Sequence, residues 1–340
     1  MKKMALLGLA MMVSAAPALA EGGRTGGSIL GRYLGGRSNG MGQAFTAIEG
    51  DIESLGYNPG GLAFIERPTA GLSYLRGYAG DNNGLMAVSV RVFGLNITPG
   101  VLYYNSGNIA YKNSVTGSIK NVTAEQDTVG MLAVSFRPLQ RLGVGGTVKY
   151  ARFNLAEEAK TSGMYYDVGA VYAAAGGIRL GVAQQNIGPD IKFETQGDPP
   201  PSTTRAGAAL TYSIGSAGAT QDMDIVSSEI TFSADWMNVK DEDSYLQCGL
   251  EISLLTLSDM RAALRGGYMF NRDVDGLTLG LGADQGDIEL DYAFGSSSAM
   301  DNRHQITLSY KFGRGRIRQP DAQGGSAADD SDDPGIIIVE

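Results

Sequence analysis

The sequence is poor in the residues that build several common kinds of functional site. It has one cysteine and one histidine, Cys248 and His304, among 340 residues. A disulfide framework needs paired cysteines and a zinc site needs several His or Cys ligands, so we expect neither, and no metal. Basic residues are also in deficit: 27 Lys and Arg face 36 Asp and Glu, and the net charge of −9 argues against a nucleic-acid-binding protein.

Long apolar runs are missing after the first twenty residues, and none approaches the ~18 residues that a membrane-spanning helix requires. The N-terminus itself reads as a signal peptide. Lys2 and Lys3 precede an apolar stretch over 4–13. Ala18 and Ala20 supply the small residues of a cleavage signal. We therefore expect removal of residues 1–20, and either an exported soluble protein or an outer-membrane barrel.

Glycine is abundant, with 49 residues, and it separates or interrupts short alternating segments. From about Thr69 to Phe312, apolar residues recur at every second position, with Gly, Asn, Asp or Pro between the segments, as in half-buried strands. The pattern predicts fourteen strands at 69–77, 84–92, 95–105, 127–137, 142–155, 164–175, 178–188, 203–214, 229–239, 244–255, 260–271, 277–285, 287–295 and 303–312.

Each segment has one apolar and one polar face, as in the last segment, where Ile306 and Leu308 alternate with Thr307 and Ser309. A soluble sandwich shows the same alternation, so connection lengths must decide. Long connections such as 106–126 alternate with turns such as 93–94, which is typical of bacterial outer-membrane barrels. One long connection, 215–228, stands where a short turn is expected. It could instead contain a strand that the count misses. The sequence thus predicts an all-β fold, a 14-stranded antiparallel transmembrane β-barrel.

The segment before the first strand carries the most specific motif. It reads GGRSNGMGQAFTAIEG over 35–50 and NPGGLA over 58–63. This run resembles the start of the PorV/PorQ and FadL-like family of outer-membrane barrels, whose members typically carry a GMGGAFTA patch, an acidic stretch and NPAGLA. The present chain has Gly60-Gly61 where the family has Ala-Gly. The glycines could suggest a dinucleotide fingerprint, but no strand precedes them, and we expect no cofactor.

The resemblance implies a hatch folded inside the barrel. Four regions follow: a signal peptide at 1–20, a hatch or plug at 21–68, the barrel at 69–312 and an acidic periplasmic tail at 313–340. The hatch residues expected to matter are, for packing on the wall, Gly40, Gly42 and Ala44; for a sharp bend, Asn58, Pro59, Gly60 and Gly61; and for an apolar ligand pocket, Met41, Phe45, Ile48, Leu55 and Leu62.

The resemblance also implies two functions of different kinds. One is passive uptake of hydrophobic, fatty-acid-like small molecules through a plugged barrel, which we favour because a hinge-like bend suits ligand-triggered opening. The other is a component of the type IX protein secretion system that binds exported cargo or partner barrels. A mainly structural barrel is a third reading.

The remaining expectations follow from the predicted location, the outer membrane of a Gram-negative bacterium. Outer-membrane lipid and lipopolysaccharide would surround the barrel, and the barrel assembly machinery would recognise Tyr310 and Phe312 during insertion. We expect no nucleic-acid partner and no enzymatic activity, since no sequence neighbour of His304 suggests a nucleophile.

Overall fold

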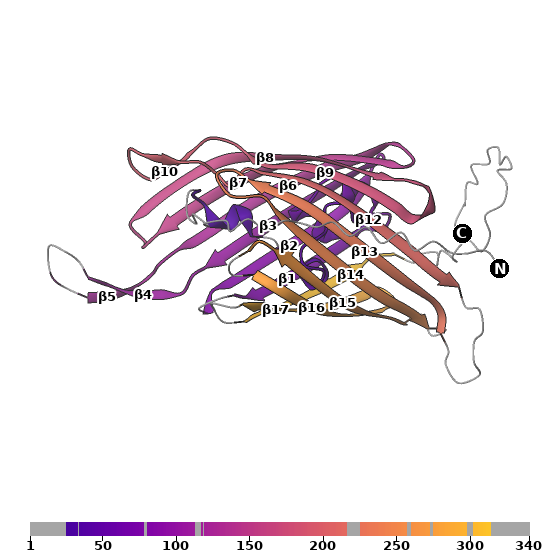
Figure 1. Cartoon of the computed structure of the whole chain (residues 1–340). Helices are drawn as coiled ribbons and strands as arrows, with labels where there is room; N and C mark the ends of the chain where they lie inside the picture. Colours follow the sequence, from indigo (N-terminus) through magenta and orange to yellow (C-terminus); the bar gives the residue numbers. More distant parts are fainter. Residues whose placement is uncertain are drawn as a thin grey trace, which may run out of the picture.

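The computed structural model describes residues 25–32, 34–77, 80–112, 117, 119–215, 225–256, 260–272, 275–297 and 302–313. Its main feature is a closed barrel of antiparallel strands (Figure 1), in which β1 pairs with both β2 and β18. The barrel strands are β1 Thr69–Arg76, β2 Asn82–Val92, β3 Leu95–Asn105, β6 Gln126–Leu139, β7 Leu142–Leu155, β8 Ala159–Ala173, β9 Ile178–Ile187, β12 Thr203–Gly215, β13 Ile225–Val239, β14 Tyr245–Thr256, β15 Met260–Phe270, β16 Asp275–Gln285, β17 Ile288–Ser297 and β18 Arg303–Lys311.

The fourteen predicted strands are confirmed as the fourteen strands of this barrel, with ends that differ by five residues or fewer. β12 pairs directly with β13, so no barrel strand stands between them in the sheet. Two small hairpins lie outside the prediction, and both fall in long connections: β4 Asn108–Lys112 with β5 Ile119–Thr123, and β10 Ile191–Lys192 with β11 Gly197–Asp198.

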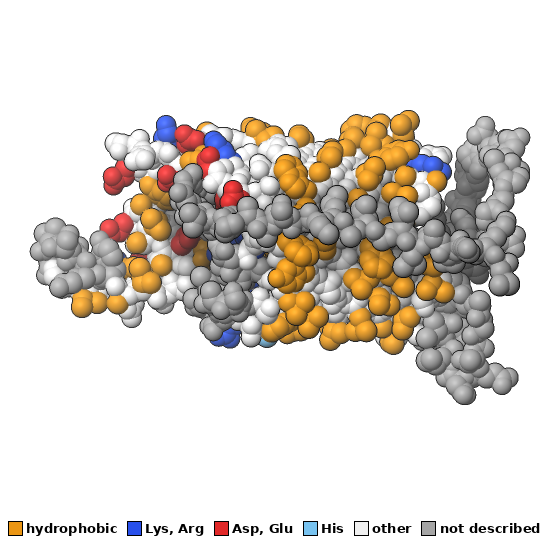
Figure 2. Space-filling view, viewed as in Figure 1, with side chains coloured by type: hydrophobic (Ala, Val, Ile, Leu, Met, Phe, Trp, Pro, Cys, Tyr) orange, Lys and Arg blue, Asp and Glu red, His pale blue; other side chains and the backbone are white. Residues whose placement is uncertain are grey.

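The faces of the strands are reversed relative to a soluble protein. On β18, Gln305, Thr307 and Ser309 are buried inside the barrel, whereas Ile306 and Leu308 are about half exposed on its outer surface. Hydrophobic side chains spread over the outer face of the strands (Figure 2). An apolar exterior around a polar interior is the pattern expected of a barrel surrounded by lipid.

The two ends of the barrel differ. β1 begins and β18 finishes at one end, which we call the terminal end. The hairpins β4–β5 and β10–β11 extend from the opposite end (Figure 1), which we call the loop end. In bacterial single-chain barrels the long loops face outward and the short turns face the periplasm.

Residues 25–68 form the N-terminal segment, drawn in indigo within the barrel in Figure 1. Its backbone bends often, so it contains only short helices. These are the 3-10 helices η1 Ser28–Gly31, η2 Ile52–Gly56 and η3 Gly61–Phe64, and the α-helix α1 Gly36–Gly40; a further 3-10 turn, η5 Ala175–Gly177, joins β8 to β9.

The N-terminal segment touches the wall on opposite sides: α1 packs on β15–β18, and η3 packs on β3, β6 and β7. In the described residues, no helix combines the length and the apolar character needed to span a bilayer. The predicted signal peptide with Ala18 and Ala20, and the tail beyond Gly313, lie outside the described residues.

Glycine has a spatial role where the wall and the N-terminal segment meet. A Cβ atom built on Gly267 of β15 would overlap the backbone nitrogen of Gly42, whereas one on the adjacent Gly266 would meet nothing within 4 Å. Gly267 points inward and Gly266 outward, so only the first is constrained by the N-terminal segment.

We therefore predict that Gly267→Ala weakens docking of the N-terminal segment by about 1–3 kcal/mol, the usual cost of overpacking. Gly266→Ala is the matched control and should behave as wild type. Hydrogen exchange of residues 36–48 measures the effect, and equal protection in both variants would contradict the prediction.

Candidate functional site

The predicted bend at Asn58 is anchored by its side chain. The Asn58 amide donates to the backbone oxygens of Thr46, at 2.7 Å, and of Ala170 on β8, at 3.0 Å, while its oxygen accepts from Gly60 N at 3.0 Å. One buried amide thus joins two parts of the N-terminal segment to the wall. The sequence predicted a bend at Asn58 but not its attachment to the wall.

The other three bend residues lie where the chain approaches the wall. Gly60 has ordinary helical dihedral angles, φ −63° and ψ −29°, so the backbone conformation does not require a glycine at this position. A Cβ there would stand 2.7 Å from the Ala170 Cα, so the constraint is space. The carbonyl of Pro59 packs against Gly145, and Gly61 N donates to Asn58 O at 3.0 Å.

The predicted packing residues contact inward glycines of the wall or are enclosed. Gly40 lies against Gly280 of β16, Gly42 lies against Gly267, and Ala44 is fully buried. Tyr310 and Phe312 form an edge-on ring pair, with centroids 4.7 Å apart, at the terminal end of β18. Their role in barrel assembly stays a prediction.

A second anchor, which the sequence did not indicate, is Asp235 on β13. Its Oδ2 accepts from the backbone nitrogens of Phe45, at 2.9 Å, and Thr46, at 2.8 Å, and from the Thr46 hydroxyl at 2.5 Å. Arg205 on β12 donates to Thr46 Oγ1 and to Gln43 O. No local pattern distinguishes Asp235 or Arg205 from other inward polar residues of strands.

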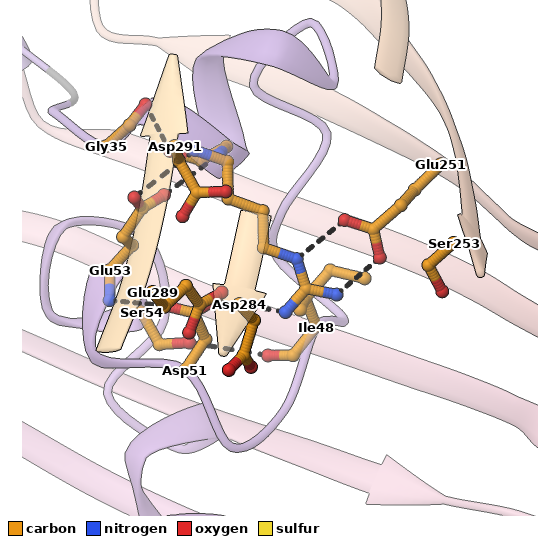
Figure 3. Close-up of polar contacts among 12 residues, drawn as sticks. Gly35, Ile48, Asp51, Glu53, Ser54, Glu251, Ser253, Asp284, Glu289 and Asp291 are labelled. Atoms are coloured by element: carbon orange, nitrogen blue, oxygen red, sulfur yellow. Dashed lines mark hydrogen bonds and ion pairs between the residues drawn. The ribbon is translucent and has the colours of Figure 1, made fainter. Parts of the chain in front are cut away.

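The third anchor is an ion-pair network around Arg37 of α1 (Figure 3). Arg37 binds Glu251 of β14 through two nitrogens, at 2.9 and 2.7 Å, and binds Asp51 at 3.0 Å. Arg265 of β15 joins Glu251 and Asp291, each at 2.6 Å. Two-point binding of a guanidinium by a carboxylate fixes both distance and orientation, so Arg37 holds α1 in one position on the wall.

Glu53 completes this network from within the N-terminal segment. Its carboxylate accepts from the backbone nitrogens of Arg37, at 3.3 Å, and Ser38, at 2.8 Å, at the start of α1. Burial, together with Asp51 and Asp291, raises the pKa of Glu53 to about 8. Burial alone would lower the pKa of Arg37, but Glu251 and Asp51 raise it well above its ordinary value.

These residues border a cavity of about 290 Å³ at the terminal end of the barrel, beside Thr69 and Lys311. Figure 3 shows Asp51, Asp284 and Glu289 around this space. Carboxylates outnumber cations in its lining: Glu49, Asp51, Glu53, Glu229, Glu251, Asp284, Glu289 and Asp291 against Arg37, Arg179, Arg261, Arg265 and Lys311. Such a lining disfavours an apolar molecule, because the molecule would displace water from the charged groups and offer them no hydrogen bonds in return.

The five predicted pocket residues do not line one cavity. Met41, Phe45 and Ile48 pack together in one cluster, whereas Leu55 and Leu62 belong to another. All five are buried, and of the five only Ile48 borders the charged cavity. Small residues of the wall let these side chains pack tightly as a core. The apolar character of the five residues in the sequence did not distinguish core packing from a ligand pocket.

Apolar space lies instead at the wall formed by β2, β3, β6 and β7. Inside is a cavity of about 20 Å³, and outside is an open groove of about 610 Å³; Met131 of β6 borders both. The inner cavity is lined by Leu30, Arg32, Leu34, Gly56, Leu85, Leu102, Val129, Met131 and Lys149. The groove is lined by Met86, Ala87, Val88, Pro99, Gly100, Val101, Gly130, Met131, Leu132, Val148 and Tyr150.

The wall is weakened at this groove. The pairing of β2 with β3 is interrupted between Ala87↔Gly100 and Val90↔Ile97, and Pro99 falls within the interruption. Proline has no backbone N–H to donate to a neighbouring strand. Gly100 and Gly130 also line the groove, and they have no side chains to fill it.

Comparison with known proteins places the fold. No family model and no curated protein matches the chain. Among solved structures, the toluene transporter TbuX of Ralstonia pickettii matches with a TM-score of 0.51 at 12% identity, covering 82% of this chain and 98% of its own. A deltaS2S3 mutant of the monoaromatic hydrocarbon channel TodX matches with a TM-score of 0.52 at 10% identity, covering 82% and 99%. A Pseudomonas aeruginosa FadL homologue matches with a TM-score of 0.45 at 11% identity, covering 80% and 96%.

The chain therefore shares its barrel fold with two proteins that are named as a toluene transporter and a monoaromatic hydrocarbon channel. The FadL-like part of the predicted resemblance has support at the level of fold, and the PorV/PorQ part has none.

We predict that Asn58→Ala loosens residues 44–62, because it removes three hydrogen bonds to the backbone, at a cost of about 1–3 kcal/mol for each buried group that is left unsatisfied. Hydrogen exchange of that stretch should rise while the barrel stays folded. The control is Asn105→Ala. The Asn105 side chain donates to the Tyr103 hydroxyl and accepts from the backbone nitrogen of Gly107, and both partners lie outside the N-terminal segment. Unchanged exchange in Asn58→Ala would contradict the anchoring role.

The raised pKa of Glu53 predicts pH-dependent docking of α1. The group is protonated when docked and releases its proton more readily when exposed, so docking is strongest below pH ~4.5 and weakens as pH rises toward 8. Glu53→Gln should remove most of this dependence. Protease protection of residues 36–56, measured from pH 5 to 9, tests it; an identical pH profile in the variant would refute the assignment.

Proposed function

We propose that this protein is a passive outer-membrane channel for hydrophobic small molecules, closed in this structure by residues 25–68 acting as a hatch. The observation that carries the proposal is Met131, which borders an apolar cavity inside the barrel and an apolar groove outside it. A molecule displacing this side chain would pass between the lumen and the membrane without meeting the charged cavity.

The distribution of charge supports this route. The cavity at the terminal end is lined mainly by acidic and basic residues, whereas the inner cavity beside Met131 is lined mainly by leucine, valine and methionine, with Arg32 and Lys149 as its two charged residues. An apolar molecule entering from the loop end would be stabilised near Met131 and opposed beyond it. The shared fold with a toluene transporter and a monoaromatic hydrocarbon channel is consistent with such cargo.

The hatch must move for transport, because the inner cavity of about 20 Å³ cannot hold an organic molecule. Leu30 and Leu34 form its hatch side, and their displacement would enlarge it. The polar anchors at Asn58, Asp235 and Arg37 would keep the rest of the hatch in place, so that opening stays local.

The same proposal implies the location of the protein and the partners around it. A Gram-negative outer membrane would contact the apolar exterior, with lipopolysaccharide at the loop end, and the assembly machinery would insert the chain. No observation favours the type IX secretion alternative, which has no support from the comparisons.

We predict that Met131→Trp blocks the route by filling the space between cavity and groove. An added barrier of about 1.4 kcal/mol would slow uptake about tenfold. The assay is entry of a fluorescent apolar probe into proteoliposomes. Met164→Trp, an outward substitution on β8 that borders neither space, is the control, and Asn58→Ala should change the flux in the opposite direction. Equal uptake by Met131→Trp and wild type would refute the route.

A further inference from the structure

Four polar side chains at the loop end each have one buried atom without a hydrogen-bond partner among the described residues. Asn83 and Asp127 are 1% exposed and Asp81 is 6% exposed. In the part of the chain that the structure describes, Asn83 Oδ1, Asp127 Oδ2 and Asp81 Oδ1 have no donor, and Arg32 Nε has no acceptor. A buried polar atom that nothing satisfies destabilises the folded protein. We call Arg32, Asp81, Asn83 and Asp127 the rim cluster.

The members of the rim cluster lie around one ring. The Arg32 guanidinium stacks 3.9 Å above the centre of Tyr104 and binds Asp81 at 2.7 Å, and the Asn83 amide lies 3.5 Å from the same carboxylate. In the strand register, Tyr104 stands between Asn83 on β2 and Asp127 on β6. Arg32 and Asn83 therefore meet at the Asp81 carboxylate, whereas Asp127 lies on the other side of Tyr104 from Asn83.

The chemistry of the cluster limits what could satisfy it. Unsatisfied acceptors require a donor, and Arg32 Nε requires an acceptor. A hydroxyl group supplies both from one atom. A carboxylate supplies no donor, and it would face Asp81, Asp127 and Glu125, the last of which interacts with Asp127. Among the described residues no three His, Cys, Asp or Glu side chains could hold a metal ion, so a cation site is not indicated.

The cluster also adjoins the apolar cavity of the proposed channel. Arg32 lines that cavity together with Leu30, Leu34, Leu85 and Leu102. A molecule with an apolar body beside these leucines could place a polar end at the rim cluster. Water would satisfy the polar atoms equally well, but it would make no use of the adjoining apolar surface.

We propose that the rim cluster binds the hydroxyl group of an otherwise apolar molecule, an alcohol or a phenol, whose hydrocarbon part occupies the adjoining cavity when the hatch opens. The inference rests on the proposed function and names its substrate class. Asn83 accepts the proton of the hydroxyl and Arg32 donates to its oxygen, while the surplus of carboxylates excludes carboxylic acids.

The test uses three ligands with one carbon skeleton: butylbenzene, 4-phenylbutan-1-ol and 4-phenylbutanoate. Their dissociation constants are measured on the full chain in nanodiscs at pH 7. We expect the alcohol to bind about fivefold to tenfold more tightly than butylbenzene, the gain from one or two net hydrogen bonds, and the carboxylate to bind most weakly.

Two variants assign the gain to the cluster. Asn83→Leu, close in shape but without the acceptor, should abolish the advantage of the alcohol and leave butylbenzene binding unchanged. Asn82→Leu is the matched control, because Asn82 is adjacent on β2 and its oxygen accepts from the outward Tyr74 hydroxyl at 2.5 Å. Asn82→Leu should keep the full preference for the alcohol.

Failure of this inference differs from failure of the proposed function. If butylbenzene binds and the alcohol gains nothing, or keeps its advantage in Asn83→Leu, water satisfies the cluster and the inference is overturned while the channel proposal stands. If neither ligand binds the wild-type protein, both proposals fail.

Discussion

A barrel of fourteen strands encloses more space than its inward side chains can fill, and this geometric surplus shapes the rest of the molecule. Small eight-stranded barrels fill their interior with side chains alone, whereas larger ones enclose a channel unless other chain occupies it. Here residues 25–68 occupy it. Close approach of two backbones requires small residues on both sides, as at Gly42 against Gly267 and Gly60 against Ala170.

The filling is held by polar contacts on one face and apolar contacts on another. Arg37, Asp235 and Asn58 join the N-terminal segment to different strands through buried ion pairs and hydrogen bonds. Leu30 and Leu34 make apolar contact near the loop end instead. Polar contacts have strict geometry and apolar contacts do not, so the two regions differ in how easily they rearrange. Arg32, between these two leucines, binds Asp81 and is a polar contact within the apolar region.

The strands were predictable because their signal is local. Alternation over ten residues is sufficient to locate β18, and connection lengths distinguished a membrane barrel from a sandwich. The site was far less predictable. Glu251 and Arg37 are 214 residues apart. A one-dimensional pattern cannot show that an inward glutamate of a wall strand meets an arginine of the plugging segment. The predicted pocket residues Met41, Phe45 and Leu55 lie in two packed clusters, which the sequence could not show because apolar side chains pack as readily against a wall as around a ligand.

The separation in sequence of these partners has a consequence for assembly. Gly36 donates a hydrogen bond to Thr307 of β18, 271 positions later, and α1 packs chiefly on β15–β18. Contacts so distant in sequence form slowly because the intervening chain must first be ordered. The N-terminal segment is synthesised before its binding surface exists, and that surface is complete only when β18 closes against β1. Docking of the segment therefore belongs to the last stage of folding, so until the barrel has closed the lumen has no lining to hold it.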